Sequence, residues 1–246
     1  MATNTQIESV TFLSPETDGA EIGGDLVGVG TTSSPALILI PDVHGISPLY
    51  RTLGERLAAA GFRTLVLDIY AREGAPHLAD MAQVGEWIAN LPDERVLGDV
   101  AAARVYLASR ADVTESAIGI LGFCLGGQYA LMAACRLPQI TACASFYGML
   151  RYAERSERKP ASALDMAPQL SCPLVGLYGA DDSLIPTADV SELRDILERG
   201  GKEFDLVTYE GAGHAFLNEA RPEAYRPEAA ADAWERALKL FQKYLS

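Results

Sequence analysis

Short runs of β-branched and other apolar residues alternate along the chain with stretches whose apolar residues recur every three or four positions. Runs of the first kind are typical of strands buried on both faces of a parallel sheet, and they occupy residues 36–40, 64–68, 117–121, 141–147, 174–178 and 204–209. Two earlier runs, 10–13 and 25–29, predict an antiparallel pair at the start. The alternation indicates an α/β fold with a mostly parallel sheet and helices on both of its faces.

Four of the intervening stretches have the apolar spacing of amphipathic helices. We interpret all four stripes as faces turned toward the core and not as binding surfaces. They contain Leu49, Leu53 and Leu57 before Gly61; Val96, Val100, Ala103 and Leu107; Val190, Leu193 and Leu197 before Gly200 and Gly201; and Trp234, Ala237, Leu238, Phe241 and Leu245.

The length of 246 residues favours one domain that spans residues 1–246. The segment between Tyr147 and Cys172 is too short to form a large cap domain, and its charge run, residues 154–159, predicts a solvated loop or a short helix. Without such a cap, we expect an open pocket at the carboxyl ends of the strands.

Composition narrows the possible partners and the compartment. No apolar run is long enough to cross a bilayer, and the first ten residues show no secretory signal, so we expect a cytoplasmic protein without a membrane partner. The four cysteines lack C-x-x-C spacing, which favours reduced thiols. A net charge of -13 disfavours nucleic acid, and an anionic substrate would need a local basic group.

The stretch LGFCLGGQY places Cys124 at the centre of a G-x-[nucleophile]-x-G turn between an apolar run and a helix, the pattern of a nucleophile elbow. A phosphate-binding loop is the alternative, but it would need a Lys-Ser/Thr pair where Gln128 and Tyr129 stand. An inert thiol is the usual fate of a free cysteine, yet the start of a helix favours a thiolate. The other three, Cys135, Cys143 and Cys172, are predicted to be structural.

A nucleophile needs a base and an orienting acid, which in α/β-hydrolases follow it in the order acid, then histidine. Asp181 and Asp182 follow the strand at 174–178, and His214, which follows the strand at 204–209, is the only histidine after the elbow. One of the two aspartates could instead cap the next helix, and their spacing leaves the choice open.

The stretch PDVHG, residues 41–45, follows the strand at 36–40 and resembles the loop that lends a backbone N–H to an oxyanion hole. We assign the two donors to Val43 and Leu125. Asp42 is either a turn residue or a neighbour of the thiol, and His44 is expected to brace the loop. His77 is expected to be solvated.

From residue 36 onward the sequence resembles the dienelactone hydrolase family, also called carboxymethylenebutenolidases. The resemblance is carried by GFCLGG around Cys124, LDIYAREG at 67–74, FYG at 146–148, G-x-x-D-x-x-I-P at 179–186 and GHAF at 213–216. It implies an α/β-hydrolase fold and a Cys-His-Asp triad of Cys124, His214 and Asp182.

The same resemblance implies further site residues. Arg72 matches an arginine that holds a substrate carboxylate, and Asp42 stands where the family has a glutamate that regulates the thiol. Asn218 replaces a second arginine of the carboxylate clamp, and His44 replaces an aromatic side chain. His44, Asn218 and Tyr147 are therefore the other candidates for substrate binding.

A cysteine nucleophile suits small activated esters, enol-lactones and thioesters, and this chemistry requires no metal or organic cofactor. We therefore predict a hydrolase of cyclic or other small esters that works through an acyl-enzyme, as a monomer or small homo-oligomer. One alternative is a general carboxylesterase or thioesterase for neutral substrates. The other is a non-catalytic scaffold or thiol sensor, although no resolving cysteine lies near Cys124 in the sequence.

Overall fold

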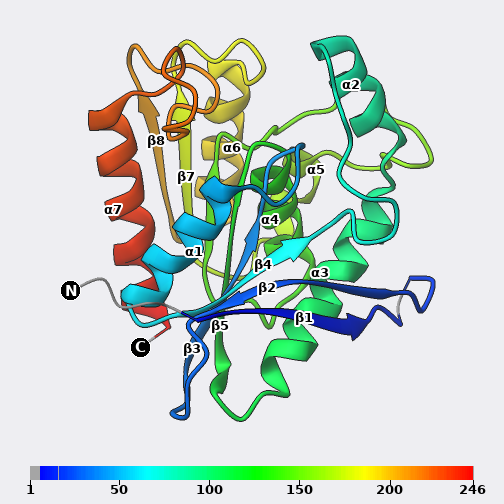
Figure 1. Ribbon diagram of the computed structural model, residues 1–246. Coiled ribbons are helices and arrows are strands. Elements are labelled where there is room, and N and C mark those ends of the chain that lie inside the picture. The colour runs from blue at the N-terminus through cyan, green and yellow to red at the C-terminus, as the bar shows by residue number, and fades with distance from the viewer. Residues whose placement is uncertain (1–5, 16, 246) are drawn as a thin grey trace.

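The computed structural model describes residues 6–15 and 17–245, so residues 1–5 of the N-terminal segment considered above lie outside it. Within this part, one sheet has the strand order β1-β2-β4-β3-β5-β6-β7-β8 (Figure 1). The strands are β1 Ile7–Leu13, β2 Glu21–Val27, β3 Ser34–Ile40, β4 Arg63–Asp68, β5 Val113–Phe123, β6 Cys143–Phe146, β7 Leu174–Gly179 and β8 Phe204–Tyr209.

The first strand pairs are antiparallel and the remainder are parallel. β2 pairs antiparallel with both β1 and β4, and from β4 across to β8 every neighbouring pair is parallel. This confirms the predicted strands and the antiparallel start. All parallel strands end at one edge of the sheet, where their loops meet.

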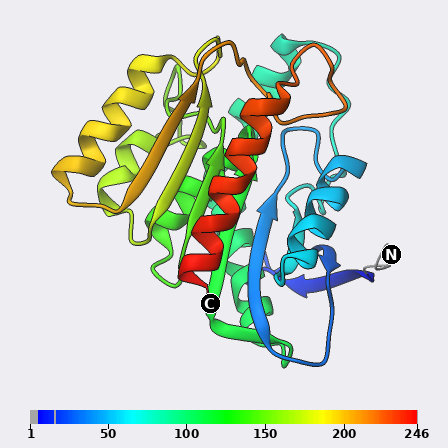
Figure 2. The same cartoon turned by 90° about the vertical axis from the view of Figure 1, so that its left-hand side faces the viewer.

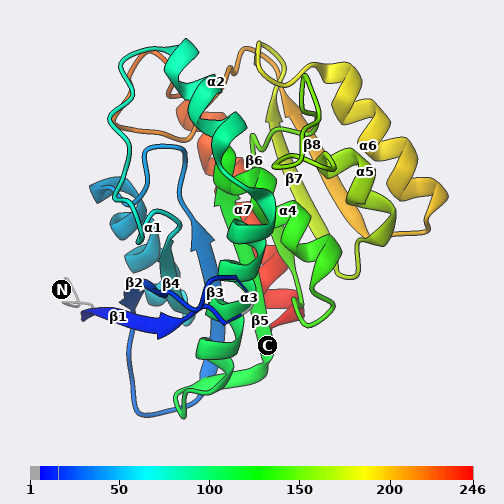
Figure 3. The ribbon, with the colours of Figure 1, turned by 90° about the vertical axis from the view of Figure 1, so that its right-hand side faces the viewer.

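Helices cover both faces of the sheet. They are α1 Pro48–Ala59, α2 Met81–Asn90, α3 Asp93–Ala108, α4 Leu125–Arg136, α5 Ala163–Met166, α6 Thr187–Arg199 and α7 Pro227–Tyr244, with a 3₁₀ turn at Ala167–Gln169. α1 and α7 lie on one face (Figure 2), and α3 and α4 lie on the other (Figure 3). The four predicted stripes belong to α1, α3, α6 and α7, and their central residues are buried as expected.

α2 was not predicted from the sequence. Its N-terminus is capped by Asp80, whose carboxylate accepts a hydrogen bond from the Gln83 N–H. None of its residues is fully buried, and it stands beyond the carboxyl end of β4 (Figure 1). Its main aromatic contact is Trp87 against Tyr70, with ring centroids 5.8 Å apart. Its apolar residues Met81, Val84, Trp87 and Ile88 do recur at helical spacing, so the signal was present in the sequence.

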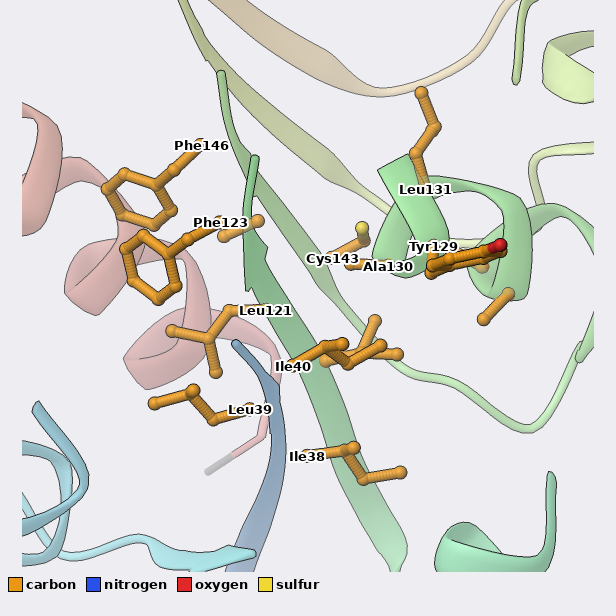
Figure 4. Packing of buried hydrophobic residues seen from close by; sticks show 14 of the residues in the cluster. Ile38, Leu39, Ile40, Leu121, Phe123, Tyr129, Ala130, Leu131, Cys143 and Phe146 are labelled. Carbon is orange, nitrogen blue, oxygen red and sulfur yellow. The ribbon is translucent and has the colours of Figure 1, made fainter. Parts of the chain in front are cut away.

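The core follows the alternation of side chains along each strand. Leu39, Leu121, Phe123 and Phe146 point toward α7, whereas Ile38 and Ile40 point to the opposite face of the sheet (Figure 4). The rings of Phe123 and Phe146 stack with centroids 4.6 Å apart. Because Phe123 directly precedes Cys124, this packing fixes the strand end from which the elbow starts.

The segment after β6 differs from the prediction at one residue. Lys159, the last residue of the charge run, is only 2% exposed, and its Nζ donates hydrogen bonds to Asp93 Oδ1 at 2.7 Å and Tyr129 Oη at 2.8 Å. The hydroxyl of Tyr152 donates to the same carboxylate oxygen. The charge run was therefore wrongly interpreted as wholly solvated, because a buried carboxylate from α3 binds its lysine.

The strand order, together with a sharp turn between β5 and α4, identifies the α/β-hydrolase fold. The segment from Tyr147 to Cys172 holds only α5 and the 3₁₀ turn, which confirms that no large cap domain is inserted there. Within the described residues, none of the helices has both the length and the apolar character of a membrane span.

Candidate active site

Cys124 occupies the turn between β5 and α4 with φ 55° and ψ −118°, a backbone conformation that non-glycine residues rarely adopt. Its N–H donates a hydrogen bond to Phe146 O at 3.0 Å, and its side chain is half-buried. Such strain is maintained only where the surrounding structure enforces it, and it is concentrated at functional sites.

Two glycines make this turn possible. A Cβ at Gly122 would lie 2.0 Å from Gly126 O, and a Cβ at Gly126 would lie 2.1 Å from Ile40 O. The start of α4 therefore packs directly on the end of β3. This packing places Leu125 beside the loop that contains Val43. Within the described chain, neither the N–H of Val43 nor the N–H of Leu125 makes a loop or turn hydrogen bond.

His214 binds one of the two candidate aspartates. Its Nδ1 lies 2.7 Å from Asp182 Oδ2, and Asp182 is buried, with its other oxygen accepting a hydrogen bond from the Leu184 N–H. Asp181 is exposed. The structure therefore brings Asp182, and not Asp181, together with His214, which is the arrangement implied by the family resemblance.

The second ring nitrogen of His214 has a different environment from the first. Nε2 is buried and makes no hydrogen bond with any described residue. Burial lowers the pKa of His214, but the hydrogen bond to Asp182 and the neighbouring Cys124 outweigh it and raise the pKa to about 10. The raised pKa favours the protonated form of the His214 imidazole at neutral pH.

The other three cysteines have a different environment. Burial raises the pKa of Cys135 and of Cys172 to about 12, and it raises the pKa of Cys143 well above its usual value. All three are buried thiols that remain protonated, and all four cysteines are free. This supports their interpretation as structural residues and leaves Cys124 as the reactive candidate.

Tyr147 packs against His214. Their ring centroids lie 5.3 Å apart in an edge-to-face arrangement, and Tyr147 has the same contact distance to Phe216. Tyr147 has φ 39° and Ala215 has φ 62°, so the three non-glycine residues with positive φ in the described chain all lie at Cys124 or next to His214. Among residues 6–15 and 17–245, positive φ at non-glycine residues is thus confined to the candidate site.

Asp42 lies near the thiol, together with two tyrosines. Its Oδ1 accepts a hydrogen bond from the His44 N–H at 2.9 Å. Burial raises the pKa of the Tyr50 and Tyr147 hydroxyls, and the charge of Asp42 raises both further. The charge of Cys124 also raises the pKa of both hydroxyls. The thiol, the carboxylate and the two hydroxyls therefore form one cluster.

Sequence reasoning missed two residues of this region. Tyr50 lies in the first turn of α1, where no motif singled it out. Tyr70 donates a hydrogen bond from its hydroxyl to Val43 O at 3.1 Å and so fixes the predicted oxyanion loop. Tyr70 belongs to the stretch LDIYAREG, so that motif could have pointed to it.

The structure gives Arg72 other partners than a substrate. Its Nη1 lies 2.6 Å from Asp99 Oδ2, its Nε lies 2.8 Å from Asp18 Oδ2, and its Nη2 bonds Thr17, Asp18 and Asp99. All three guanidinium nitrogens are therefore occupied, and the charge of Arg72 is already balanced. This arrangement does not support the predicted role in holding a substrate carboxylate.

Two other substrate-binding candidates are also not brought against the triad. The Asn218 side chain accepts a hydrogen bond from the Ala220 N–H at 3.0 Å and so closes a local turn. His44 is exposed, as is His77. Of the four predicted substrate-binding residues, Tyr147 alone contacts a triad residue through an aromatic interaction.

Three surface hollows lie away from the thiol. The first has a volume of about 340 Å³ and lies between α7 and the starts of β7 and β8. The second, of about 410 Å³, lies between α3, α4 and α5. The third, of about 380 Å³, lies beside Asp18 and Arg95. No triad residue lines any of the three. The candidate site is therefore identified by its chemistry and not by volume.

Among residues 6–15 and 17–245, no cluster of three His, Cys, Asp or Glu side chains could hold a metal ion.

Comparison with known proteins identifies the family of the chain. The model of the dienelactone hydrolase family matches residues 25–245. A protein of Bradyrhizobium sp., named as a probable 2-oxo-3-(5-oxofuran-2-ylidene)propanoate lactonase, is 40% identical over 210 residues, which cover 85% of this chain and 84% of that protein. A protein of Escherichia coli K12, provisionally assigned as a carboxymethylenebutenolidase, is 32% identical over 212 residues, covering 85% and 77% of the two chains.

A solved structure extends the similarity to the fold. The crystal structure of a provisionally assigned dienelactone hydrolase from Klebsiella pneumoniae subsp. pneumoniae has a TM-score of 0.88 at 29% identity and covers 97% of this chain and 100% of its own. Sequence and structure thus lead to the same assignment. The chain belongs to the dienelactone hydrolase family and is a carboxylic ester hydrolase.

Proposed function

We propose that this protein hydrolyses cyclic enol-lactones and related small esters through a covalent acyl-enzyme on Cys124. The observation that supports this most directly is the His214–Asp182 pair at 2.7 Å beside a strained cysteine at the start of α4. Family membership supports an enzyme over the scaffold or thiol-sensor alternatives.

In the first half-reaction the Cys124 thiolate attacks the carbonyl carbon of the ester. The N–H groups of Val43 and Leu125 stabilise the oxyanion that forms. Collapse of this intermediate breaks the bond to the ring oxygen, which accepts the proton held by His214 and leaves as an enol. The product is a thioester on Cys124, which is still tethered to the opened ring when the substrate is a lactone.

In the second half-reaction His214, now neutral, removes a proton from water as that water attacks the thioester. The same two N–H groups stabilise the second oxyanion. Collapse releases the carboxylic acid and returns the thiolate beside a protonated His214, so the proton balance closes. Asp182 keeps the imidazole in the tautomer and orientation that both steps require. Neither step uses a metal or an organic cofactor.

The substrate class follows from the charges around the thiol. Asp42 lies near Cys124, Asn218 replaces a second arginine, and Arg72 is neutralised by Asp18 and Asp99. Arg221, whose charge lowers the pKa of Tyr147, is paired with Glu223. With both arginines paired, a neutral lactone or ester fits this site better than one that depends on a carboxylate clamp. This favours the second candidate, a general carboxylesterase acting on small neutral esters in the cytoplasm.

Turnover of a dienelactone and of p-nitrophenyl acetate by the wild-type protein and by Cys124→Ala tests the proposal. We expect both substrates to be hydrolysed, with kcat/KM for the neutral ester equal to or above that for the dienelactone, and no turnover by the variant. Unchanged turnover by Cys124→Ala would exclude Cys124 as the nucleophile. If kcat/KM for the dienelactone were at least about 100-fold above that for the ester, the protein would have a carboxylate-binding site after all.

A further inference from the structure

Arg226 joins the start of α7 to the loop that carries His214. This loop, residues 210–218, follows the carboxyl end of β8 and lies beside the start of α7 (Figure 1). The Arg226 N–H donates a hydrogen bond to Phe216 O at 2.9 Å, and its side-chain Nε donates to Gly211 O at 2.9 Å. One residue therefore holds both arms of the loop, and His214 lies between the two points of attachment.

The guanidinium of Arg226 is fixed within its own segment. Its Nη1 donates to Glu223 O and to Tyr225 O, both at 3.0 Å. All three acceptors of the guanidinium are thus backbone carbonyl oxygens, which suits the rigid fork of donors in arginine. Arg226 directly precedes α7 and makes no side-chain cap there, so a change of its side chain leaves the hydrogen bond from the Ala230 N–H to Arg226 O in place.

The loop needs these restraints because its backbone is strained next to His214. Ala215 has φ 62°, a conformation that is unfavourable for a residue with a Cβ. From the side of β7, the Asp181 N–H donates to Ala212 O at 2.9 Å. Without restraints on both sides, the strained backbone would relax and move the imbidazole away from Asp182, whose carboxylate it meets at 2.7 Å.

We propose that Arg226 is a positioning residue, whose guanidinium fixes the backbone of residues 210–218 in the conformation that sets the imidazole of His214 against Asp182. This inference rests on the proposed role of His214 in proton transfer. Arg226 itself is exposed and acts through the loop. A displacement of about 1 Å at a catalytic group can slow turnover by about 100-fold, so a surface guanidinium can control kcat without contact with the substrate.

Steady-state hydrolysis of p-nitrophenyl acetate by Arg226→Ala tests the inference. We expect kcat to fall about tenfold while KM stays within about twofold, because a misplaced imidazole slows the chemical steps and leaves ester binding unchanged. In the His214→Ala background, measured with the protein in excess over the ester, Arg226→Ala should change the remaining turnover by less than about twofold. A residue that only supported the fold would lower turnover in both backgrounds.

Arg194→Ala is the matched control. Arg194 Nη2 donates to Leu206 O at 2.8 Å, so this variant also removes a bond from a guanidinium to a carbonyl, but on β8 and not on the loop after it. Its kcat should stay within about twofold of wild type. Should Arg226→Ala not fold, Arg226→Lys replaces it, because an ammonium keeps the charge and lacks the fork of donors.

Three results would overturn the inference: an unchanged kcat in the Arg226 variant, an equal loss in Arg194→Ala, or an equal loss in the His214→Ala background. The folded fraction of each variant is measured by circular dichroism, so that kcat refers to folded protein. The proposed function fails separately, through full ester turnover in Cys124→Ala or in His214→Ala.

Discussion

His214 Nδ1 lies 2.7 Å from Asp182 Oδ2, although Asp181, one residue earlier, is exposed to solvent. Two chemically identical neighbours thus have different environments. One is buried against an imidazole and receives a backbone hydrogen bond from Leu184, whereas the other has a solvated carboxylate. The chain therefore provides its own matched control for the orienting acid.

Asp182→Asn should lower kcat for p-nitrophenyl acetate by about 10²- to 10⁴-fold, because an amide favours the wrong tautomer of His214. Asp181→Asn should leave kcat within about twofold of wild type. Steady-state kinetics of the two variants measures the difference. Equal losses in both would mean that the acid does not act through His214.

The stability of the protein should depend on pH through His214. Its pKa in the folded state is about 10, above the usual value of 6.5, so the protonated form is the one that folding stabilises. The contribution is complete below pH 6.5 and is lost as pH rises toward 10. Urea unfolding of wild type and His214→Ala across this range should show their stability difference shrinking with pH. A difference that is constant or grows with pH contradicts the assignment.

Gly126→Ala should destabilise the protein by at least about 3 kcal/mol or displace the elbow, because the new Cβ would lie 2.1 Å from Ile40 O. Esterase activity should fall with it. Gly85→Ala in α2, where no atom lies within 4 Å of the added Cβ, should stabilise by up to about 1 kcal/mol. Thermal unfolding and activity of both variants provide the comparison.

Sequence patterns were sufficient for the strands and the four core-facing helices, and they singled out Cys124 and His214 as candidates, whereas the choice of Asp182 over Asp181 needed the family resemblance. Each feature that the patterns identified has a strong local signal, such as strict helical spacing or a glycine-flanked turn. The partners of Arg72 and Lys159 could not be predicted, because Asp99 and Asp93 approach them only through tertiary packing of α3. Tyr50 was missed for the same reason, since its contact with Phe123 joins elements far apart in the sequence.

Arg72 should act on stability and not on substrate affinity. Asp99 is fully buried, so Arg72→Met would leave its carboxylate without a cation and cost about 3–5 kcal/mol. Arg155→Met, which breaks an exposed pair with Asp165, should cost less than about 1 kcal/mol. Urea unfolding of the two variants measures these losses in the free energy of unfolding. If Arg72→Met instead raised KM selectively for a carboxylate-bearing lactone and left the stability unchanged, Arg72 would be a substrate-binding residue.

We expect the sulfur of Cys124 to carry the acyl group during turnover. Mixing the protein with p-nitrophenyl acetate, quenching in acid within one turnover and mapping peptides by mass spectrometry tests this directly. We expect one acetyl group on the peptide that contains Cys124, in an amount that matches the burst of p-nitrophenol, and neither burst nor label in Cys124→Ala. Multiple-turnover hydrolysis with no label on Cys124, or a label that persists in Cys124→Ala, would contradict it.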